Sequence, residues 1–150
     1  MIFSSLVLAL AAVSAPSPLP TPQSLPVMTL RAPHAQLRVQ IAKTEAQRER
    51  GLMSVRHLRA HTGMLFIFDA DAPVAFWMKD TLIPLDMVFL ASDGTVRKVF
   101  ARVPVVSPQL RDADIPLEQG SAKFVIELPS GEAAQDGLRP GARVAGLPSP

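Results

Sequence analysis

The sequence of 150 residues contains no cysteine, which excludes disulfide bonds, thiol catalysis and metal sites built from thiolates. Tyrosine is also absent, and tryptophan occurs only once, at position 77. Charged residues are few, at 19% of the chain, and give a formal net charge of +2 without a long basic run. This pattern does not favour nucleic acid as a partner. Hydrophobic residues account for 48%, which is enough for the core of one domain.

The first fifteen residues, MIFSSLVLALAAVSA, are typical of a secretory signal peptide. The apolar run at residues 2–13 is short for a membrane span, and the small residues Ala12, Ser14 and Ala15 allow cleavage. No Lys or Arg precedes the run, so an uncleaved tail or a mis-assigned start is the alternative. We expect a signal peptide at residues 1–15 and a periplasmic or secreted protein, with membrane contact only through an uncleaved signal segment.

Residues 16–26 contain five prolines in eleven positions. Proline fixes φ and removes a backbone donor, so this segment is predicted to be an extended or disordered linker. The first charged side chain is Arg31. A single folded domain is therefore expected at residues 27–147.

Most of that domain is predicted to consist of short strands. Alternation and apolar composition favour strands at residues 27–31, 37–43, 64–68, 95–103, 123–128 and 142–147, with loops at 69–73 and 104–121. In the segment 123–128, Lys123 and Glu127 are expected on the solvent side. The pattern predicts a compact, mainly β (α+β) domain with a small antiparallel or mixed sheet, or a barrel-like arrangement. Eight residues are expected in one core: Leu52, Leu65, Phe66, Phe68, Met87, Phe89, Val125 and Ile126.

Two short helices are expected. Thr44 and Gln47 form a capping-box pattern, which predicts a helix that starts after Thr44, is interrupted at Gly51 and continues with an apolar stripe through residues 52–58. The second helix is expected at residues 130–137, with Ser130 as its N-cap and a glycine as its end.

The most apolar stretch, FWMKDTLIPLDMVFL at residues 76–90, is interpreted as a hairpin with strands at 76–79 and 85–91. Four polar residues interrupt it: Lys79, Asp80, Thr81 and Asp86. Its register remains open, because a shift of one residue exchanges the two faces. In one register Asp86 faces Lys79 beside Trp77, and in the other it shares a face with Met78.

These four residues and Trp77 form the candidate ligand site, with Arg50 or Arg56 nearby for an anionic group. The alternative is a structural hydrogen-bond network, because a buried polar group needs a partner in either case. Asp86 is flanked by Leu85 and Met87. We therefore expect Asp86 to be structural and Lys79 with Asp80 to line the accessible side.

Other kinds of site lack support in the sequence. His57 and His61 have the i, i+4 spacing of a helical metal site, but Gly63 follows too closely for that helix to persist, and no metal is predicted. The methionines lie among Leu and Phe, where they are core residues rather than copper ligands. The chain has no phosphate-binding loop, dinucleotide fingerprint or G-x-S-x-G pattern, so no cofactor is expected.

Five motifs together carry a family resemblance. They are T-x-x-Q-R-x-R-G-L-M-x-x-R-x-L at 44–58, G-M-L-F-I-F at 63–68, F-W-M-K-D-T-L-I-P-L-D-M-V-F at 76–89, V-I-E-L-P-S-G at 125–131 and G-L-R-P-G at 137–141. Over about residues 37–146 the sequence resembles the family called domain of unknown function 192, which comprises small bacterial and archaeal proteins that are often exported. The resemblance implies a mainly β domain with one or two short helices and no assigned activity. Asp80 departs from the Asn usual in the family, and Ala142 from a frequent Asp.

Two functions fit these observations. The first is an exported, cofactor-free binding or accessory protein of the cell envelope, which presents the region 77–86 to an unknown small ligand or an envelope protein. The second is a small cofactor-free hydrolase or lyase that uses Asp86 and Lys79 as acid/base groups.

Overall fold

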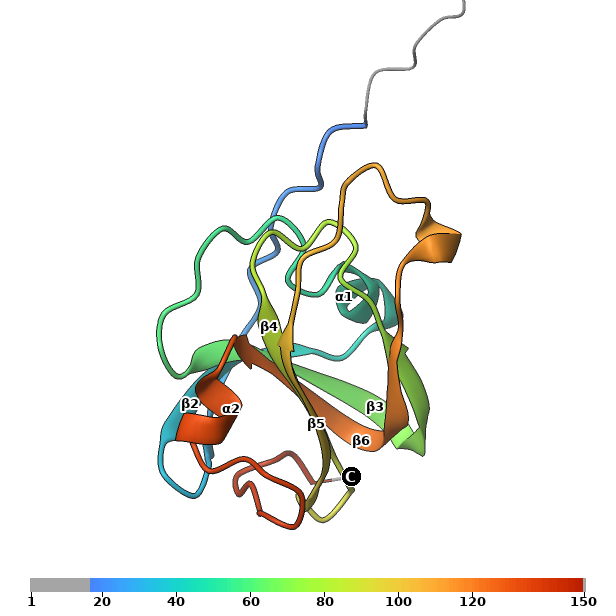
Figure 1. Ribbon diagram of the computed structural model, residues 1–150. Helices are drawn as coiled ribbons and strands as arrows, with labels where there is room; N and C mark the ends of the chain where they lie inside the picture. The colour runs from blue at the N-terminus through green and yellow to red at the C-terminus, as the bar shows by residue number, and fades with distance from the viewer. Residues whose placement is uncertain (1–16, 150) are drawn as a thin grey trace, which may run out of the picture.

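The computed structural model describes residues 17–149, so the predicted signal peptide lies outside the described residues. Six strands form one mixed sheet in the order β1-β2-β3-β6-β4-β5 (Figure 1). They are β1 (Val27–Arg31), β2 (Gln36–Ala42), β3 (Thr62–Phe76), β4 (Leu85–Leu90), β5 (Val96–Val103) and β6 (Glu118–Pro129). Only β2 and β3 pair in parallel. The helices in the described chain are α1 (Glu45–Arg50), α2 (Glu132–Gln135) and the short 3-10 turn η1 (Asp112–Asp114). The predicted fold class is confirmed, and the sheet is open rather than closed into a barrel.

The two faces of the sheet carry separate hydrophobic clusters. Neighbouring residues of a strand point to opposite faces, so Leu65 and Ile126 lie in one cluster, whereas Phe66 and Val125 lie in the other. The prediction of one core is therefore wrong. Seven of its eight residues are nevertheless buried, and Phe68 packs against the second cluster while partly exposed.

The predicted hairpin is also wrong. β3 ends at Phe76 and β4 begins at Leu85, but β6 lies between them and pairs with both. All six residues of β4 are buried, because both its faces and both its edges are covered. Lys79 and Asp86 are consequently not cross-strand partners in either register.

β6 corrects a second expectation, since Lys123 and Glu127 are buried rather than solvent-facing. A strand in the middle of a sheet that is covered on both faces has no solvent side. The Lys123 Nζ donates a hydrogen bond to the Asp69 carbonyl at 2.7 Å. This bond partly offsets the cost of burying the ammonium group.

Three further strand boundaries differ from the prediction. β6 begins at Glu118, inside the segment 104–121 where a loop was expected. β3 continues through residues 69–73, where a loop was expected, because pairing with β6 resumes at Ala72 after an irregularity that begins at Ile67. The expected strand at 142–147 is reduced to two isolated bridges. Gly141 and Gly146 adopt φ of 90° and 87°, and such left-handed residues interrupt an extended run.

The capping box at Thr44 is confirmed, and α1 ends at Gly51 with φ 46°. The predicted continuation of this helix is wrong, because residues 51–61 form turns and irregular chain in which Ser54 and His61 have φ of 64° and 57°. α2 is shorter than expected, and its N-cap is Gly131 rather than Ser130.

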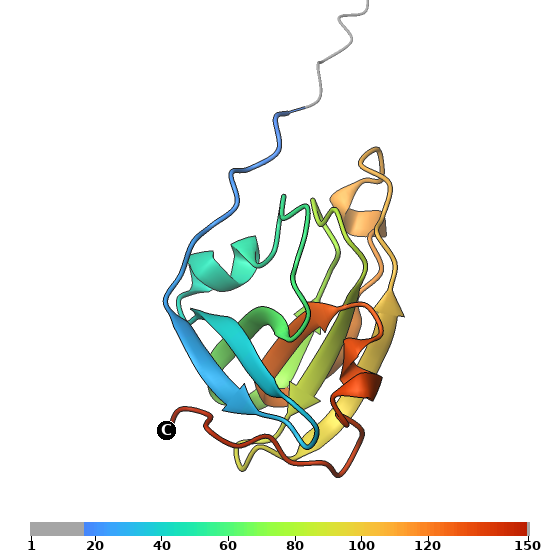
Figure 2. The same ribbon diagram turned by 90° about the vertical axis from the view of Figure 1, so that its left-hand side faces the viewer.

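The proline-rich linker contains no helix or strand at residues 17–26, and Figure 2 shows it running past α1 into β1. Its end is fixed to the domain. The Gln23 Nε2 donates hydrogen bonds to the carbonyls of Gln47 and Gly51, both at 2.9 Å, and the Leu25 amide donates to Gln40 Oε1 at 2.8 Å. Within the described chain, no helix is long and apolar enough to cross a membrane.

Candidate functional site

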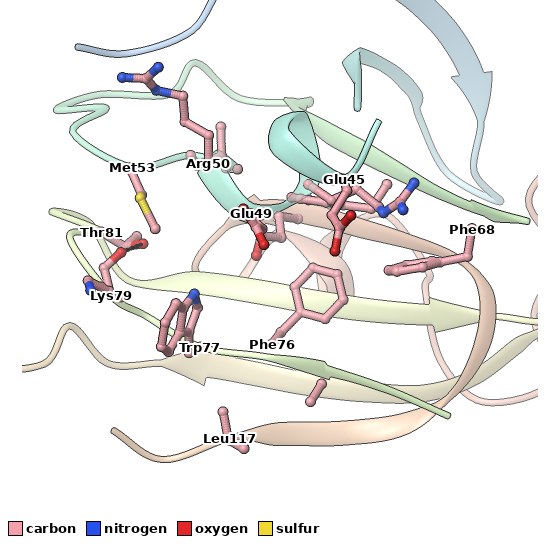
Figure 3. A pocket seen from close by; sticks show the side chains of 16 residues that line it. Glu45, Glu49, Arg50, Met53, Phe68, Phe76, Trp77, Lys79, Thr81 and Leu117 are labelled. Carbon is pink, nitrogen blue, oxygen red and sulfur yellow. Dashed lines mark hydrogen bonds between the residues drawn. The ribbon is translucent and has the colours of Figure 1, made fainter. Parts of the chain in front are cut away.

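A cavity of about 370 Å³ lies beside α1, over one face of the sheet (Figure 3). We call it the α1 cavity. Its walls come from α1, the turn that follows it, strands β3 and β6, and the segment after β3. The lining residues are Glu45, Arg48, Glu49, Arg50, Gly51, Leu52, Met53, Phe66, Phe68, Ala75, Phe76, Trp77, Lys79, Thr81, Leu117 and Glu127.

Aromatic rings form one wall of this cavity. The Phe76 ring meets Phe66 edge-to-face at 4.9 Å between centroids, and it also contacts Phe68 at 6.2 Å. On its far side, Phe76 meets Phe89 at 5.6 Å. Edge-to-face packing of this kind fixes ring orientation. The wall is therefore a rigid apolar surface to which Trp77 adds a larger ring.

Two carboxylates of α1 face these rings. Glu45 and Glu49 are four residues apart, which places them on one side of the helix. In Figure 3 their carboxylates point toward Phe76 and Trp77, whereas the Arg50 guanidinium points away from the rings. Neither glutamate forms an ion pair with any residue of the described chain.

A third carboxyl group belongs to Glu127, which is 4% exposed. Its cross-strand neighbours are Met64 on β3 and Met87 on β4. Burial raises the pKa of Glu127 to about 8, without an opposing hydrogen bond or cation among residues 17–149. At neutral pH this side chain is therefore mostly a neutral carboxylic acid that can donate a hydrogen bond.

The two cations in the lining that contact aromatic rings are already satisfied by protein groups. Arg48 lies 5.1 Å from the Phe68 centroid and donates a hydrogen bond to the Ile67 carbonyl at 2.9 Å. Lys79 lies 5.3 Å from the Trp77 ring and pairs with Asp112. The three carboxyl groups have no comparable partners. Arg50 is the third cation of the lining; it forms no ion pair within residues 17–149, and its Nε is buried without a hydrogen-bond partner there. The unpaired groups of the α1 cavity are therefore three carboxyl groups and one guanidinium.

Backbone strain accompanies the rim of the cavity. Ser54 and Asp80 have φ of 64° and 52°, in the left-handed region that L residues rarely adopt. The Ser54 amide donates to the Asp80 carbonyl at 2.9 Å, which joins the turn after α1 to the segment after β3. Strained residues of this kind cluster at ligand sites.

The DUF192 family model, described as Uncharacterized ACR, matches residues 28–146. The chain belongs to the DUF192 family. Among solved structures it is similar to a protein from Sinorhizobium meliloti 1021 that is described as a candidate transcription regulator. That similarity has 34% identity, a TM-score of 0.73 and coverage of 85% of this chain and 100% of the other. A protein of unknown function from Novosphingobium aromaticivorans DSM 12444 is 25% identical, with a TM-score of 0.69 and coverage of 86% and 94%. No curated protein matches the chain.

In this DUF192 domain, the α1 cavity brings together four of the residues that the sequence singled out: Arg50, Trp77, Lys79 and Thr81. Asp80 contributes its carbonyl to the rim but is not part of the lining. Arg56 lies elsewhere, in a groove beside the linker residues 19–22.

Asp86 also lies outside the cavity lining of the DUF192 domain, and it is fully buried. Its Oδ1 accepts hydrogen bonds from the amides of Arg102 at 2.7 Å and Gly131 at 2.9 Å, and its Oδ2 accepts from Ala133 at 2.8 Å. These contacts tie β4 to the end of β5 and the start of α2. They give Asp86 a structural role.

Sequence reasoning missed Glu45, Glu49 and Glu127. The local pattern pointed away from Glu127, because KFVIEL alternates Lys123, Val125 and Glu127 with an apolar set, as in a half-buried strand. Only the central place of β6 in a sheet covered on both faces buries this carboxyl. The i, i+4 spacing of Glu45 and Glu49 places them on one face of a helix. It does not show which part of the protein that face lies against.

Proposed function

We propose that this protein is an exported binding protein of the cell envelope that holds a small organic cation, such as an ammonium group, in the α1 cavity. The observation that carries the proposal is the set of three carboxyl groups beside fixed aromatic rings. One of them, Glu127, is buried and forms no ion pair within the described chain.

Beside the aromatic rings the lining favours a cation over an anion, because the Arg50 guanidinium points away from these rings (Figure 3). Aromatic ring faces attract cations, with about 0.5–2 kcal/mol for each contact depending on desolvation. Glu45 and Glu49 add negative charge on the opposite wall. The volume of about 370 Å³ is in the range of small-molecule sites.

Glu127 gives the proposed binding a distinctive signature. A cation beside a carboxyl group favours the charged form and lowers its pKa. Because the pKa of Glu127 is about 8 without a ligand, binding a cation near pH 7 is expected to release a proton from this residue.

The experiment uses the full chain and three matched probes: benzylammonium, benzyl alcohol and benzoate. Trp77 is the only tryptophan and lines the cavity, so its emission reports occupancy. We expect the cation to bind most tightly and to release up to one proton in weakly buffered solution at pH 7. Preference for benzoate, or equal binding of the cation and the alcohol, would contradict the proposal.

Two variants sharpen this test. Glu127→Gln keeps the size and the neutral state of the side chain, so it should retain the fold but abolish proton release. Glu118→Gln is the matched control, because Glu118 begins β6 without lining the cavity. Its binding and proton release should equal those of the unmodified protein.

A catalytic role is the second candidate, and Glu127 is the observation that favours it. A carboxylic acid with a pKa of about 8 is protonated at neutral pH and suits general acid catalysis. Asp86 and Lys79 suit it less, because the carboxylate is held by three amides and the ammonium by Asp112. If an activity is found, its pH-rate profile should change in Glu127→Gln. An unchanged profile would remove this candidate.

A further inference from the structure

A cluster of His61, Glu132 and Asp136 lies apart from the α1 cavity, where residues 51–61 meet α2. We propose that these three side chains bind one divalent transition-metal ion, of which zinc is the best match. This site is independent of the proposed function of the cavity, because none of the three residues lines that cavity.

The three residues are close enough to share an ion. One ligand atom from each lies within 4.8 Å of the other two. His61 Nδ1 and Asp136 Oδ1 are 2.9 Å apart, and Glu132 Oε2 accepts a hydrogen bond from the His61 amide at 2.8 Å. Tetrahedral zinc with bonds of about 2.0–2.2 Å holds its ligand atoms roughly 3.3–3.6 Å apart. The His61–Asp136 pair would therefore open slightly, and the more distant ligand atoms would move closer.

Asp136 supplies an independent observation that points to a missing ligand. Its side chain is 2% exposed, and its Oδ2 is buried without a hydrogen-bond partner in the described chain. A buried carboxylate oxygen without a donor is costly. A metal ion bound at Asp136 would satisfy it.

The charges around Asp136 make the need for a cation stronger. Glu132 and Asp136 each offer a carboxylate oxygen within 4.8 Å of the other, and both residues are buried. His61 is the side chain in this group that can carry positive charge. One divalent ion would neutralise Glu132 and Asp136 together.

The hydrogen bonds that position the proposed ligand residues also suit a metal site. Asp86 holds the amides of Gly131 and Ala133, so it fixes the start of the helix that carries Glu132. His61 is exposed, which leaves a path for the ion from solvent. An imidazole nitrogen with two carboxylates suits zinc, manganese or iron, and three protein ligands leave a position for water.

The i, i+4 spacing of His57 and His61, which the sequence analysis set aside, is not the arrangement of the proposed site. The i, i+4 pairing with His57 would have required a helix, but residues 51–61 are not helical. His61 has a left-handed φ of 57°, and its side chain contacts Asp136 at the end of α2. His57 is exposed and outside the cluster.

The test is a calorimetric titration of the metal-free full chain with zinc chloride. We expect one zinc ion per chain, and at least tenfold weaker binding in His61→Asn and in Glu132→Gln. Asparagine is chosen because it tolerates a left-handed φ. His57→Asn is the matched control and should bind zinc unchanged, as should Glu127→Gln.

A second measurement covers variants that fold poorly. Thermal unfolding should show that zinc raises the melting temperature of the unmodified protein but not that of His61→Asn. Cobalt should give a visible spectrum of nitrogen and oxygen ligands without thiolate bands, because the chain has no cysteine. Absence of zinc binding to the unmodified protein, or equal binding to His61→Asn, would show that the cluster is only an ion-pair network and would overturn the proposal.

Discussion

Asp86 and Glu127 are both carboxyl residues in central strands, but their surroundings are opposite. Asp86 accepts three hydrogen bonds from backbone amides. Glu127 faces aromatic and methionine side chains, and burial raises its pKa. The first arrangement supplies hydrogen-bond donors to both carboxylate oxygens, whereas burial of Glu127 favours its neutral acid. The two residues should therefore respond to amide substitution in opposite directions.

For Asp86→Asn we expect a loss of about 3 kcal/mol in the free energy of unfolding. Hydrogen bonds to a charged group contribute about 1.5–3 kcal/mol each, and the new amide group would turn a donor toward other donors. Denaturant unfolding followed by Trp77 emission measures the loss. Asp80→Asn is the control, because Asn tolerates the left-handed φ of 52° at this position. Equal stability of the two variants would contradict the structural role of Asp86.

Glu127 should make the fold less stable as the pH rises. Its pKa is about 8 in the folded protein, against a reference value of 4.5. The folded state therefore binds this proton more tightly than the unfolded state does. The contribution of Glu127 to the free energy of unfolding is fully present below pH 4.5 and is lost as the pH rises toward about 8. The slope approaches about 1.4 kcal/mol per pH unit.

Glu127→Gln should remove this decline and be more stable than the unmodified protein at pH 7–8, with little difference at pH 4. Urea unfolding across this pH range tests the expectation. A parallel pH dependence in the two proteins would mean that Glu127 is ionised in the folded state.

Among the elements, the pairing of β3 with β6 depends on a glycine. A Cβ added at Gly63 would lie 1.9 Å from the Glu127 carbonyl oxygen, so the two strands would have to separate. We expect Gly63→Ala to cost about 3 kcal/mol, near the upper end for overpacking. Gly141→Ala is the comparison, because its added Cβ meets nothing within 4 Å and costs only about 1–2 kcal/mol of backbone strain. Thermal unfolding should rank the two variants in this order.

The elements also show what the sequence could predict. Local signals identified β1, β5 and the start of α1, because alternation and capping act over a few residues. The pairing of β3 and β4 with β6 was not predictable in this way. It depends on contacts between segments distant in sequence, and the short connection between residues 76 and 85 favoured a hairpin instead.

The candidate site shows the same limit. Trp77 stood out because it is the only tryptophan, and Lys79 because it is a charged residue in an apolar stretch. Both line the α1 cavity. Glu45 lies on a separate element, and only the tertiary fold turns its side chain toward the same space. The position of Asp136 beside His61 likewise depends on where residues 51–61 cross α2.

At the scale of the whole molecule, the proposed export makes a simple prediction. Mass spectrometry of the mature protein from its source should show a chain that has lost about the first fifteen residues. Such a chain would keep Gln23 and its two hydrogen bonds to the end of α1, so its melting temperature should equal that of the full chain. An intact Met1 in the cytoplasm would contradict export, and an intact Met1 in the membrane fraction would indicate an anchor.

The central position of β6 has a consequence for the order in which the molecule can fold. β6 is the last strand in the chain, yet it joins β3 to the pair formed by β4 and β5. A growing chain that has not reached residue 118 has no strand to connect these two parts. The ribosome therefore completes most of the polypeptide before the native sheet can close, and premature termination anywhere before β6 leaves β3 and β4 with unpaired edges that invite aggregation.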